Sequence, residues 1–276
     1  MPPAPASLHD LASHAEEARD PFAGRRQGET ETPVVIQAAD GVPVYLALTR
    51  EDVAASARAL ASAWRTLGVR RGDSVLIYDY GASPLTLFAS WCYVPHLERG
   101  AADLLGAVPL CNDGLPDFAP RALHVLRYLR PGVTIVDAAN MPVFLRRVAE
   151  ERAQISEWTR MLAVSPDEET LSPPQVAAWQ RELGLPVRLL LRSGPAMFFA
   201  AECDEGALHA GPRYYRLEVV PQEGGEPAAT GQGSLCITNR FLQGTRVERY
   251  LAHVHVAIEP RPCSCGRPGR PFRCLA

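Results

Sequence analysis

Between residues 33 and 193, short β-branched runs alternate with segments of helical periodicity, and this alternation constrains the fold more than any other feature of the sequence. Residues 51–67 place apolar side chains at helical spacing, and Gly68 ends that helix. The short apolar runs at 74–78 and 133–136 are typical of buried strands. Strands that alternate with helices of about ten or more residues predict an α/β fold with a mainly parallel sheet flanked by helices.

The two ends of the chain have a different character. After residue 193 the pattern changes to strand-like stretches between Gly and Pro turns, for example at 214–220 and 234–238. The first residues are rich in Pro, Ala and charge, with one short amphipathic stretch at 8–18. Three parts are predicted: an N-terminal arm (1–32), an α/β core (33–193) and a smaller, mostly β region with a Cys/His cluster (194–276).

The chain contains no lysine, because all 28 of its Lys and Arg residues are arginine. Mechanisms that need an ε-amine as base, Schiff base or phosphate clamp are therefore excluded. A net charge of -3 with mixed signs argues against a nucleic-acid partner. No apolar run reaches the roughly 20 residues that span a bilayer, and the N-terminus lacks a signal pattern. We expect no membrane partner and a cytoplasmic location.

Seven cysteines are scattered along the chain, and an odd number favours free thiols or metal ligands over a disulfide framework. The strongest constellation contains Cys203, His209, Cys263 and Cys265. Thiolates and imidazole are the ligands that tetrahedral zinc prefers, so a closed structural zinc site is predicted. The alternatives are thiols without metal in the core or on the surface, and a catalytic role for Cys203 with His209. Cys274 is a more distant substitute ligand.

Cys92 and His96 form a second constellation, within a helical region that we predict at 84–105. Four-residue spacing on a helix would place thiol and imidazole on one face, where histidine lowers the thiol pKa and creates a nucleophile. An intervening proline weakens that geometry. Cys111 is a third candidate nucleophile, because it follows a predicted strand at 107–110 and the carboxyl ends of parallel strands face the ligand crevice. Burial in the core is the competing interpretation of both cysteines.

Three arginines are candidates for anion recognition, namely Arg192, Arg246 and Arg249. A guanidinium pairs with phosphate or carboxylate in a bidentate geometry, which suits the phosphate of coenzyme A or of a carrier protein. Surface salt bridges would explain each of these arginines equally well.

Two segments carry a family resemblance. Residues 41–77, GVPVYLALTREDVAASARALASAWRTLGVRRGDSVLI, end in Leu-Gly-Val-x-x-Gly-Asp. Residues 202–268 contain Cys-x5-His and later Pro-Cys-x-Cys-Gly-Arg. Together these segments resemble the phenylacetate-CoA ligase branch of the adenylate-forming, acyl-CoA synthetase-like superfamily. The resemblance implies the N-terminal core of the adenylate-forming fold and a Cys/His cluster as a feature of the branch.

The motifs that this resemblance implies for ATP chemistry are changed. The phosphate loop corresponds to 36–43, which has one glycine, no hydroxyl and an aspartate. The magnesium-binding glutamate is absent from 192–196, and Val254 stands where the resemblance implies a ribose-binding aspartate. The chain stops at Ala276, where the resemblance implies a further C-terminal domain with a catalytic lysine. We therefore expect neither ATP nor magnesium to be used.

These departures favour an ATP-independent acyltransferase that moves an aryl or acyl group from a coenzyme A thioester to an acyl carrier protein, in polyketide-type secondary metabolism. A thioester already holds the activation energy, so a nucleophile, a base and an acyl pocket suffice. Members of this superfamily with such a transfer role include enzymes of anthraniloyl transfer to a carrier protein, which this chain resembles in class. We expect Cys92, His96 and Cys111 to be catalytic, and Arg192 and Arg249 to bind the cofactor. The alternative is a catalytically silent, ligase-like partner of a carrier protein or of a separate complete ligase.

Overall fold

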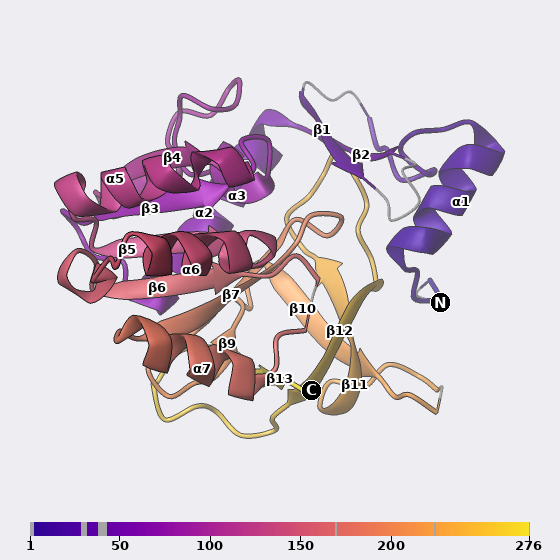
Figure 1. Cartoon of the computed structure of the whole chain (residues 1–276). Helices are drawn as coiled ribbons and strands as arrows, with labels where there is room; N and C mark the ends of the chain where they lie inside the picture. The colour runs from indigo at the N-terminus through magenta and orange to yellow at the C-terminus, as the bar shows by residue number, and fades with distance from the viewer. Residues whose placement is uncertain (1–2, 29–31, 38–42, 169, 224, 276) are drawn as a thin grey trace.

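The computed structural model describes residues 3–28, 32–37, 43–168, 170–223 and 225–275. Eleven of the strands in this part of the chain form one sheet, in the order β10-β11-β12-β13-β9-β8-β7-β6-β5-β3-β4 (Figure 1). Its parallel half contains β3 (Ser74–Asp79), β4 (Val108–Asp113), β5 (Val133–Asp137), β6 (Met161–Ser165) and β7 (Val187–Ser193).

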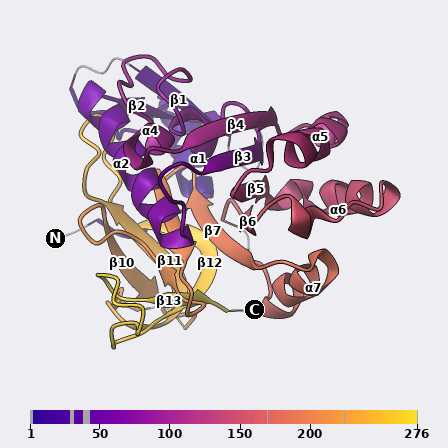
Figure 2. The same ribbon diagram turned by 90° about the vertical axis from the view of Figure 1, so that its left-hand side faces the viewer.

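Helices cover both faces of the parallel half. Figure 2 shows one layer of helices on either side of the sheet. One layer contains α5 (Ala119–Leu129), α6 (Met141–Glu150) and α7 (Pro173–Leu183), and the other contains α2 (Arg50–Leu67), α3 (Pro84–Leu87) and α4 (Ala101–Leu105). Successive side chains of a strand point to opposite faces of the sheet. Val75 and Ile77 of β3 pack in the core on the side of α2, which we call the α2 core, whereas Leu76 and Tyr78 pack in the core on the side of α5, α6 and α7. The predicted α/β fold with a flanked, mainly parallel sheet is confirmed.

The antiparallel half continues the same sheet. Strand β7 pairs in parallel with β6 and in antiparallel fashion with β8, so the sheet runs without a break from the α/β core into the β region. The strands of this half are β8 (Phe198–Glu202), β9 (Leu208–His209), β10 (Tyr215–Val220), β11 (Gly231–Asn239), β12 (Tyr250–Ile258) and β13 (Phe272–Cys274). The sequence did not predict β8, β9 or β13.

The N-terminal arm packs along β12. Its helix α1 (Leu8–Ala18) has the predicted bounds. The backbone N–H of Ala6 donates to the carbonyl of Arg249 at 3.2 Å, and the N–H of Leu251 donates back to Ala6 at 2.9 Å. A hairpin of β1 (Thr32–Gln37) and β2 (Pro43–Leu48) follows. Most of the predicted phosphate loop, residues 38–42, lies outside the described residues.

The helical region predicted at 84–105 is wrong in its middle. Only α3 and α4 are helical, and turns connect them. The segment folds back on itself, because the N–H of Ala101 donates to the carbonyl of Phe88 at 2.8 Å. A Cβ at Gly100 would lie 2.3 Å from the Cα of Ser90, so the close approach of the two ends of this loop requires glycine at position 100. Within the described ranges, no helix is long and apolar enough to cross a bilayer.

Asp52 fastens helix α2 to the connection that leads into β12. Its carboxylate accepts the N–H of Thr49 at 2.9 Å in a capping box, and it accepts the N–H groups of Gln243 and Gly244 at 2.8 Å each. The side chain is fully buried. A buried carboxylate that satisfies three backbone donors links two segments that are far apart in sequence.

We predict that Asp52→Ala lowers the free energy of unfolding by about 3 kcal/mol, because it leaves buried backbone donors without an acceptor. The neighbouring Glu51, whose exposed carboxylate pairs with Arg58, provides the control. Glu51→Ala should change stability by about 0.5 kcal/mol or less. Urea unfolding measures both values, and equal effects of the two substitutions would contradict the role given to Asp52.

Candidate functional site

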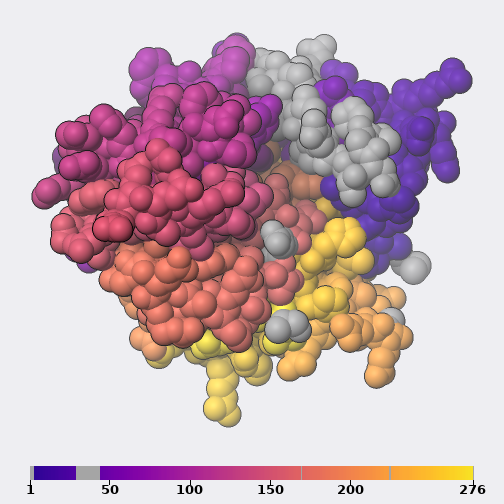
Figure 3. Space-filling view, in the orientation of Figure 1, coloured from indigo at the N-terminus to yellow at the C-terminus, as the bar shows by residue number. Residues whose placement is uncertain are grey.

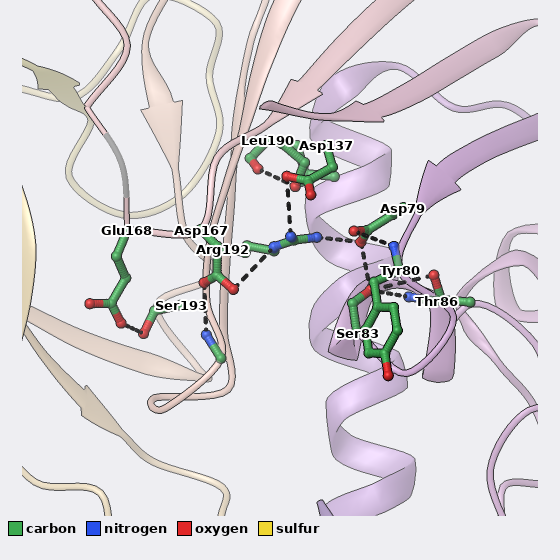
Figure 4. A network of polar contacts seen from close by, with 12 residues as sticks. Asp79, Tyr80, Ser83, Thr86, Asp137, Asp167, Glu168, Leu190, Arg192 and Ser193 are labelled. Carbon is green, nitrogen blue, oxygen red and sulfur yellow. Dashed lines mark hydrogen bonds and ion pairs between the residues drawn. The ribbon is translucent and has the colours of Figure 1, made fainter. Parts of the chain in front are cut away.

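Polar side chains converge where the parallel strands end. Asp79 and Asp137 are the last residues of β3 and β5, Asp167 follows β6, and Arg192 lies near the end of β7. Because the carboxyl ends of parallel strands meet at one edge, residues far apart in sequence come together there (Figure 4). We call Asp79, Asp137, Asp167 and Arg192 the Arg192 cluster.

The guanidinium of Arg192 faces all three aspartates of this cluster. Its Nη1 donates to Asp79, its Nη2 lies 3.4 Å from Asp137, and its Nε lies 3.6 Å from Asp167. The Arg192 residue is only 5% exposed, so water screens these interactions little. Arg192, predicted to bind coenzyme A, therefore has three partners within the protein.

The cluster carries more negative than positive charge. Burial raises the pKa of Asp137 to about 6, although Arg192 opposes that shift. Beside the cluster, burial also raises the pKa of Glu168, whose carboxylate accepts hydrogen bonds from Ser193 and, at 2.7 Å, from the hydroxyl of Tyr250. Binding of a polyphosphate at this edge would be unfavourable, because the carboxylates would repel its negative charge.

Arg249 and Arg246 belong to other ion pairs. The Nη2 of Arg249 lies 3.7 Å from Glu218, and Arg246 pairs with Glu248 at 2.8 Å on the surface. The arginines predicted to recognise a phosphate are therefore distributed over separate ion pairs. Phosphate recognition by Arg192 and Arg249 stays a prediction.

Cys92 and Cys111 meet at one tyrosine. After burial, the thiols of Cys111 and Cys92 also contribute to the raised pKa of Tyr93, so the Tyr93 hydroxyl lies near both of them. The Cys92 sulfur lies 3.6 Å from the hydroxyl of Ser90. Cys92 is exposed and Cys111 is half-buried. Burial raises the pKa of Cys111, and the carboxylate of Asp79 adds to that shift, so the Cys111 thiol lies near Asp79 of the Arg192 cluster. We call Cys92 and Cys111 the thiol pair.

His96 does not share a helical face with Cys92. The segment between them consists of turns, so the helical spacing that motivated this pair is not realised. His96 has a positive φ of 65° and lines a cavity of about 520 Å³ whose lining does not include Cys92. A catalytic role for Cys92 with His96 stays a prediction, but the shared helical face on which it was based is not formed. No sequence spacing indicated the thiol pair, because Cys92 and Tyr93 lie in a loop whereas Cys111 lies on strand β4.

The four predicted metal ligands come together. Cys203 follows β8, His209 ends β9, and Cys263 and Cys265 lie in the loop before β13. Their ligand atoms all lie within 4.8 Å of one another. The sulfurs of Cys203 and Cys263 are 3.9 Å apart, and the Cys265 sulfur is 3.3 Å from Nε2 of His209. We call these residues the Cys/His cluster; Cys274, the substitute ligand, is not part of it.

This arrangement fits a tetrahedral metal ion. Two thiolates on a tetrahedral ion at about 2.3 Å lie roughly 3.8 Å apart, close to the distance observed between Cys203 and Cys263. Burial lowers the pKa of His209, so the imidazole is neutral and can act as a ligand. Its Nε2 faces the sulfur of Cys265. The Cys/His cluster could therefore hold a metal ion.

Comparisons with known proteins agree on the fold. No family model and no curated protein matches the chain. A solved structure of 2-hydroxyisobutyryl-CoA ligase, in complex with 2-HIB-AMP and CoA in the thioesterification state, matches with a TM-score of 0.77, 17% identity, 97% of this chain and 56% of that chain. An open conformation of the same ligase matches with a TM-score of 0.75 and 16% identity, over 98% of this chain and 62% of that chain. The anthranilate CoA ligase AuaEII, in complex with anthranoyl-AMP, matches with a TM-score of 0.60 and 13% identity, over 87% of this chain and 46% of that chain.

The likeness concerns the fold. TM-scores of 0.60–0.77 show that the chain has the fold of the N-terminal part of adenylate-forming acyl-CoA ligases, and identities of 13–17% limit the likeness to the fold. The chain spans 46–62% of the length of these ligases. The expected adenylate-forming fold is confirmed, while the phenylacetate-CoA ligase branch stays a prediction.

The charge of the Arg192 cluster predicts a pH dependence. The pKa of Asp137 rises from 3.8 to about 6 on folding, so its stabilising contribution is complete below about pH 4 and is lost as the pH rises through 6. Between pH 5 and pH 8 this loss is roughly 1.4 kcal/mol. Asp137→Asn should remove it, and urea unfolding across that range measures the difference. Glu182→Gln, at an exposed position of α7, is the control. An unchanged pH dependence in Asp137→Asn would contradict the assignment.

Proposed function

We propose that this protein is an ATP-independent acyltransferase, which moves an acyl or aryl group from a coenzyme A thioester to an acyl carrier protein. The observation that carries the proposal is the thiol pair, in which two cysteines lie near the hydroxyl of Tyr93 and one of them, Cys111, lies near Asp79 at the carboxyl edge of the sheet. Ligases of the same fold bind CoA and acyl-AMP, which supports a thioester as substrate.

Cys92 is the proposed acyl acceptor. It is exposed, whereas Cys111 is half-buried and burial raises the pKa of its thiol. Burial also raises the pKa of Tyr93, so its hydroxyl keeps a proton that it can donate to a developing thiolate or oxyanion. Trp91 and Tyr80 are about 60% exposed and offer aromatic surface to an acyl group.

The proposed reaction has two balanced steps. The exposed Cys92 thiol gives its proton to solvent, and its thiolate attacks the thioester carbonyl. The bond from that carbon to the sulfur of coenzyme A breaks, and the released thiolate takes up a proton from solvent. The thiolate of the carrier protein then attacks the acyl-cysteine and releases Cys92. No phosphate bond is broken, in agreement with the excess of carboxylates in the Arg192 cluster.

A specific observation favours a second candidate function, a catalytically silent partner of a carrier protein or of a complete ligase. Arg192, at the edge where α/β folds bind ligands, is engaged by three aspartates of the same chain. A ligase-like fold with this edge occupied by its own side chains could be retained for binding alone.

We predict that the protein forms a covalent adduct of one acyl group when incubated with benzoyl-CoA or hexanoyl-CoA, as measured by intact mass. Cys92→Ser should abolish the adduct, because it removes the attacking sulfur. Cys274→Ser, in a half-buried strand thiol, is the control and should leave the adduct unchanged. Transfer to a carrier protein, followed on its own mass, should be lost in the same variant.

Two outcomes would contradict parts of this scheme. Transfer that persists in Cys92→Ser without an adduct would exclude covalent catalysis by this residue. If neither an adduct nor transfer occurs with either thioester, the acyltransferase is excluded, and the silent-partner proposal predicts binding of a carrier protein or ligase in the absence of turnover.

We also propose that the Cys/His cluster holds a structural zinc ion. Three thiols and one imidazole form a closed set of four donors, which leaves no position for a substrate. The ion would fasten the loop at 263–265 to the residues around β8 and β9.

The zinc proposal predicts about one zinc ion per chain in purified protein, measured by elemental mass spectrometry. Cys265→Ser should lower the zinc content and the free energy of unfolding by several kcal/mol, because a structural ion contributes directly to folding. Cys92→Ser should change neither value, since this thiol lies outside the Cys/His cluster. Protein free of zinc, with unchanged stability in Cys263→Ser and Cys265→Ser, would exclude the metal.

A further inference from the structure

A cavity of about 370 Å³ lies between the N-terminal arm and the residues that lead into β12. The arm contributes Ala4 and Leu11 to its lining, and the other side contributes Val247 and Tyr250. In the space-filling view the indigo arm lies beside the yellow C-terminal part of the chain (Figure 3). The volume is in the range of small-molecule sites. We call it the arm cavity; it contains no member of the thiol pair or the Cys/His cluster.

Arg25 lines the arm cavity with an incompletely satisfied guanidinium. Its Nε donates to the carbonyl of Phe22 at 3.4 Å, whereas its Nη2 is buried without a hydrogen-bond partner among the residues described. The carboxylate of the nearby Asp20 accepts the N–H groups of Phe22 at 3.0 Å and Gly24 at 2.6 Å, and its negative charge opposes the lowering of the Arg25 pKa. Burial lowers the pKa of Arg25 to about 10, so it stays protonated at neutral pH.

The remaining charges of the lining define the ligand. Arg246 and Glu248 pair with each other at 2.8 Å and offset one another, which leaves the single positive charge of Arg25. One cation suits a monoanion, while a phosphomonoester or nucleotide would bring more negative charge than the arm cavity balances. Leu11, Val247 and the ring of Tyr250 suit an apolar body.

We propose that the arm cavity binds an organic monocarboxylate, with the carboxylate on Arg25 and the apolar body against Leu11 and Val247. The arm forms one wall of this site, and it is held by backbone hydrogen bonds, such as those of Ala6, and by the packing of Leu8 and Leu11 against the core. A ligand that contacts both walls favours the docked arm over an undocked one. The site is independent of the proposed acyl transfer.

Benzoate and hexanoate are the probes, with benzamide and hexanamide as neutral counterparts of the same shape. We expect each acid to bind at least about tenfold more tightly than its amide, because a charge-assisted hydrogen bond is lost. Isothermal titration measures the affinity. Trypsin provides a second readout, since cleavage after Arg19 in the arm should slow when benzoate binds.

Two substitutions locate the site. Arg25→Met should weaken benzoate binding about tenfold or more. Arg26→Met is the matched control, because this neighbouring, exposed arginine lies over the ring of Phe22 and not in the arm cavity. Ala4→Trp, at an exposed arm position, should fill the cavity and abolish binding without perturbing the core.

The proposal is overturned if the amides bind as tightly as the acids, or if Arg25→Met and Arg26→Met bind benzoate equally. Should Arg25→Met fail to fold, as judged by circular dichroism, the folded Ala4→Trp variant decides: unchanged benzoate binding in that variant would equally overturn the proposal.

Discussion

The guanidinium of Arg192 holds the carboxyl edge of the sheet together. It lies on β7, the strand that pairs in parallel with β6 and in antiparallel fashion with β8, and therefore on the strand that unites both halves of the sheet. Its contacts with Asp79, Asp137 and Asp167 connect β7 to the ends of β3, β5 and β6. Removing one partner of a buried ion pair leaves an uncompensated charge, so this edge tolerates little rearrangement. A sheet built in this way offers a fixed frame for sites at its margins.

The sites that we infer lie around that frame. The thiol pair is on the connection between β3 and β4 and on β4, which is an edge strand of the sheet. The Cys/His cluster lies between the short strand β9 and the loop before β13. The arm cavity forms where the N-terminal arm meets β12. Each site combines a rigid strand with a less regular segment, a common location for binding and catalytic residues.

Periodicity predicted the core well, because burial on defined faces determines it. Helix α2 and strands β3 and β5 lie within a residue or so of their predicted bounds. Strands β9 and β13 contain two and three residues, too few to show an alternation. The region at 84–105 is apolar because its loop packs into the α2 core, and apolar spacing reports burial without specifying a helix. The three partners of Arg192 are separated by long stretches of sequence, and their common position at strand ends was the only signal available.

The exclusive use of arginine has a physical consequence in two of these places. In the Arg192 cluster, three nitrogens of one planar group face three different carboxylates, which a single ammonium nitrogen cannot reproduce in the same geometry. In the arm cavity, Arg25 keeps its proton although burial lowers its pKa to about 10. A lysine has a lower pKa than an arginine before burial, so comparable burial would bring the lysine pKa closer to neutral pH. Arginine thus permits buried cations that stay charged, and the absence of lysine is compatible with a chemistry of anion recognition that does not use an amine as a base.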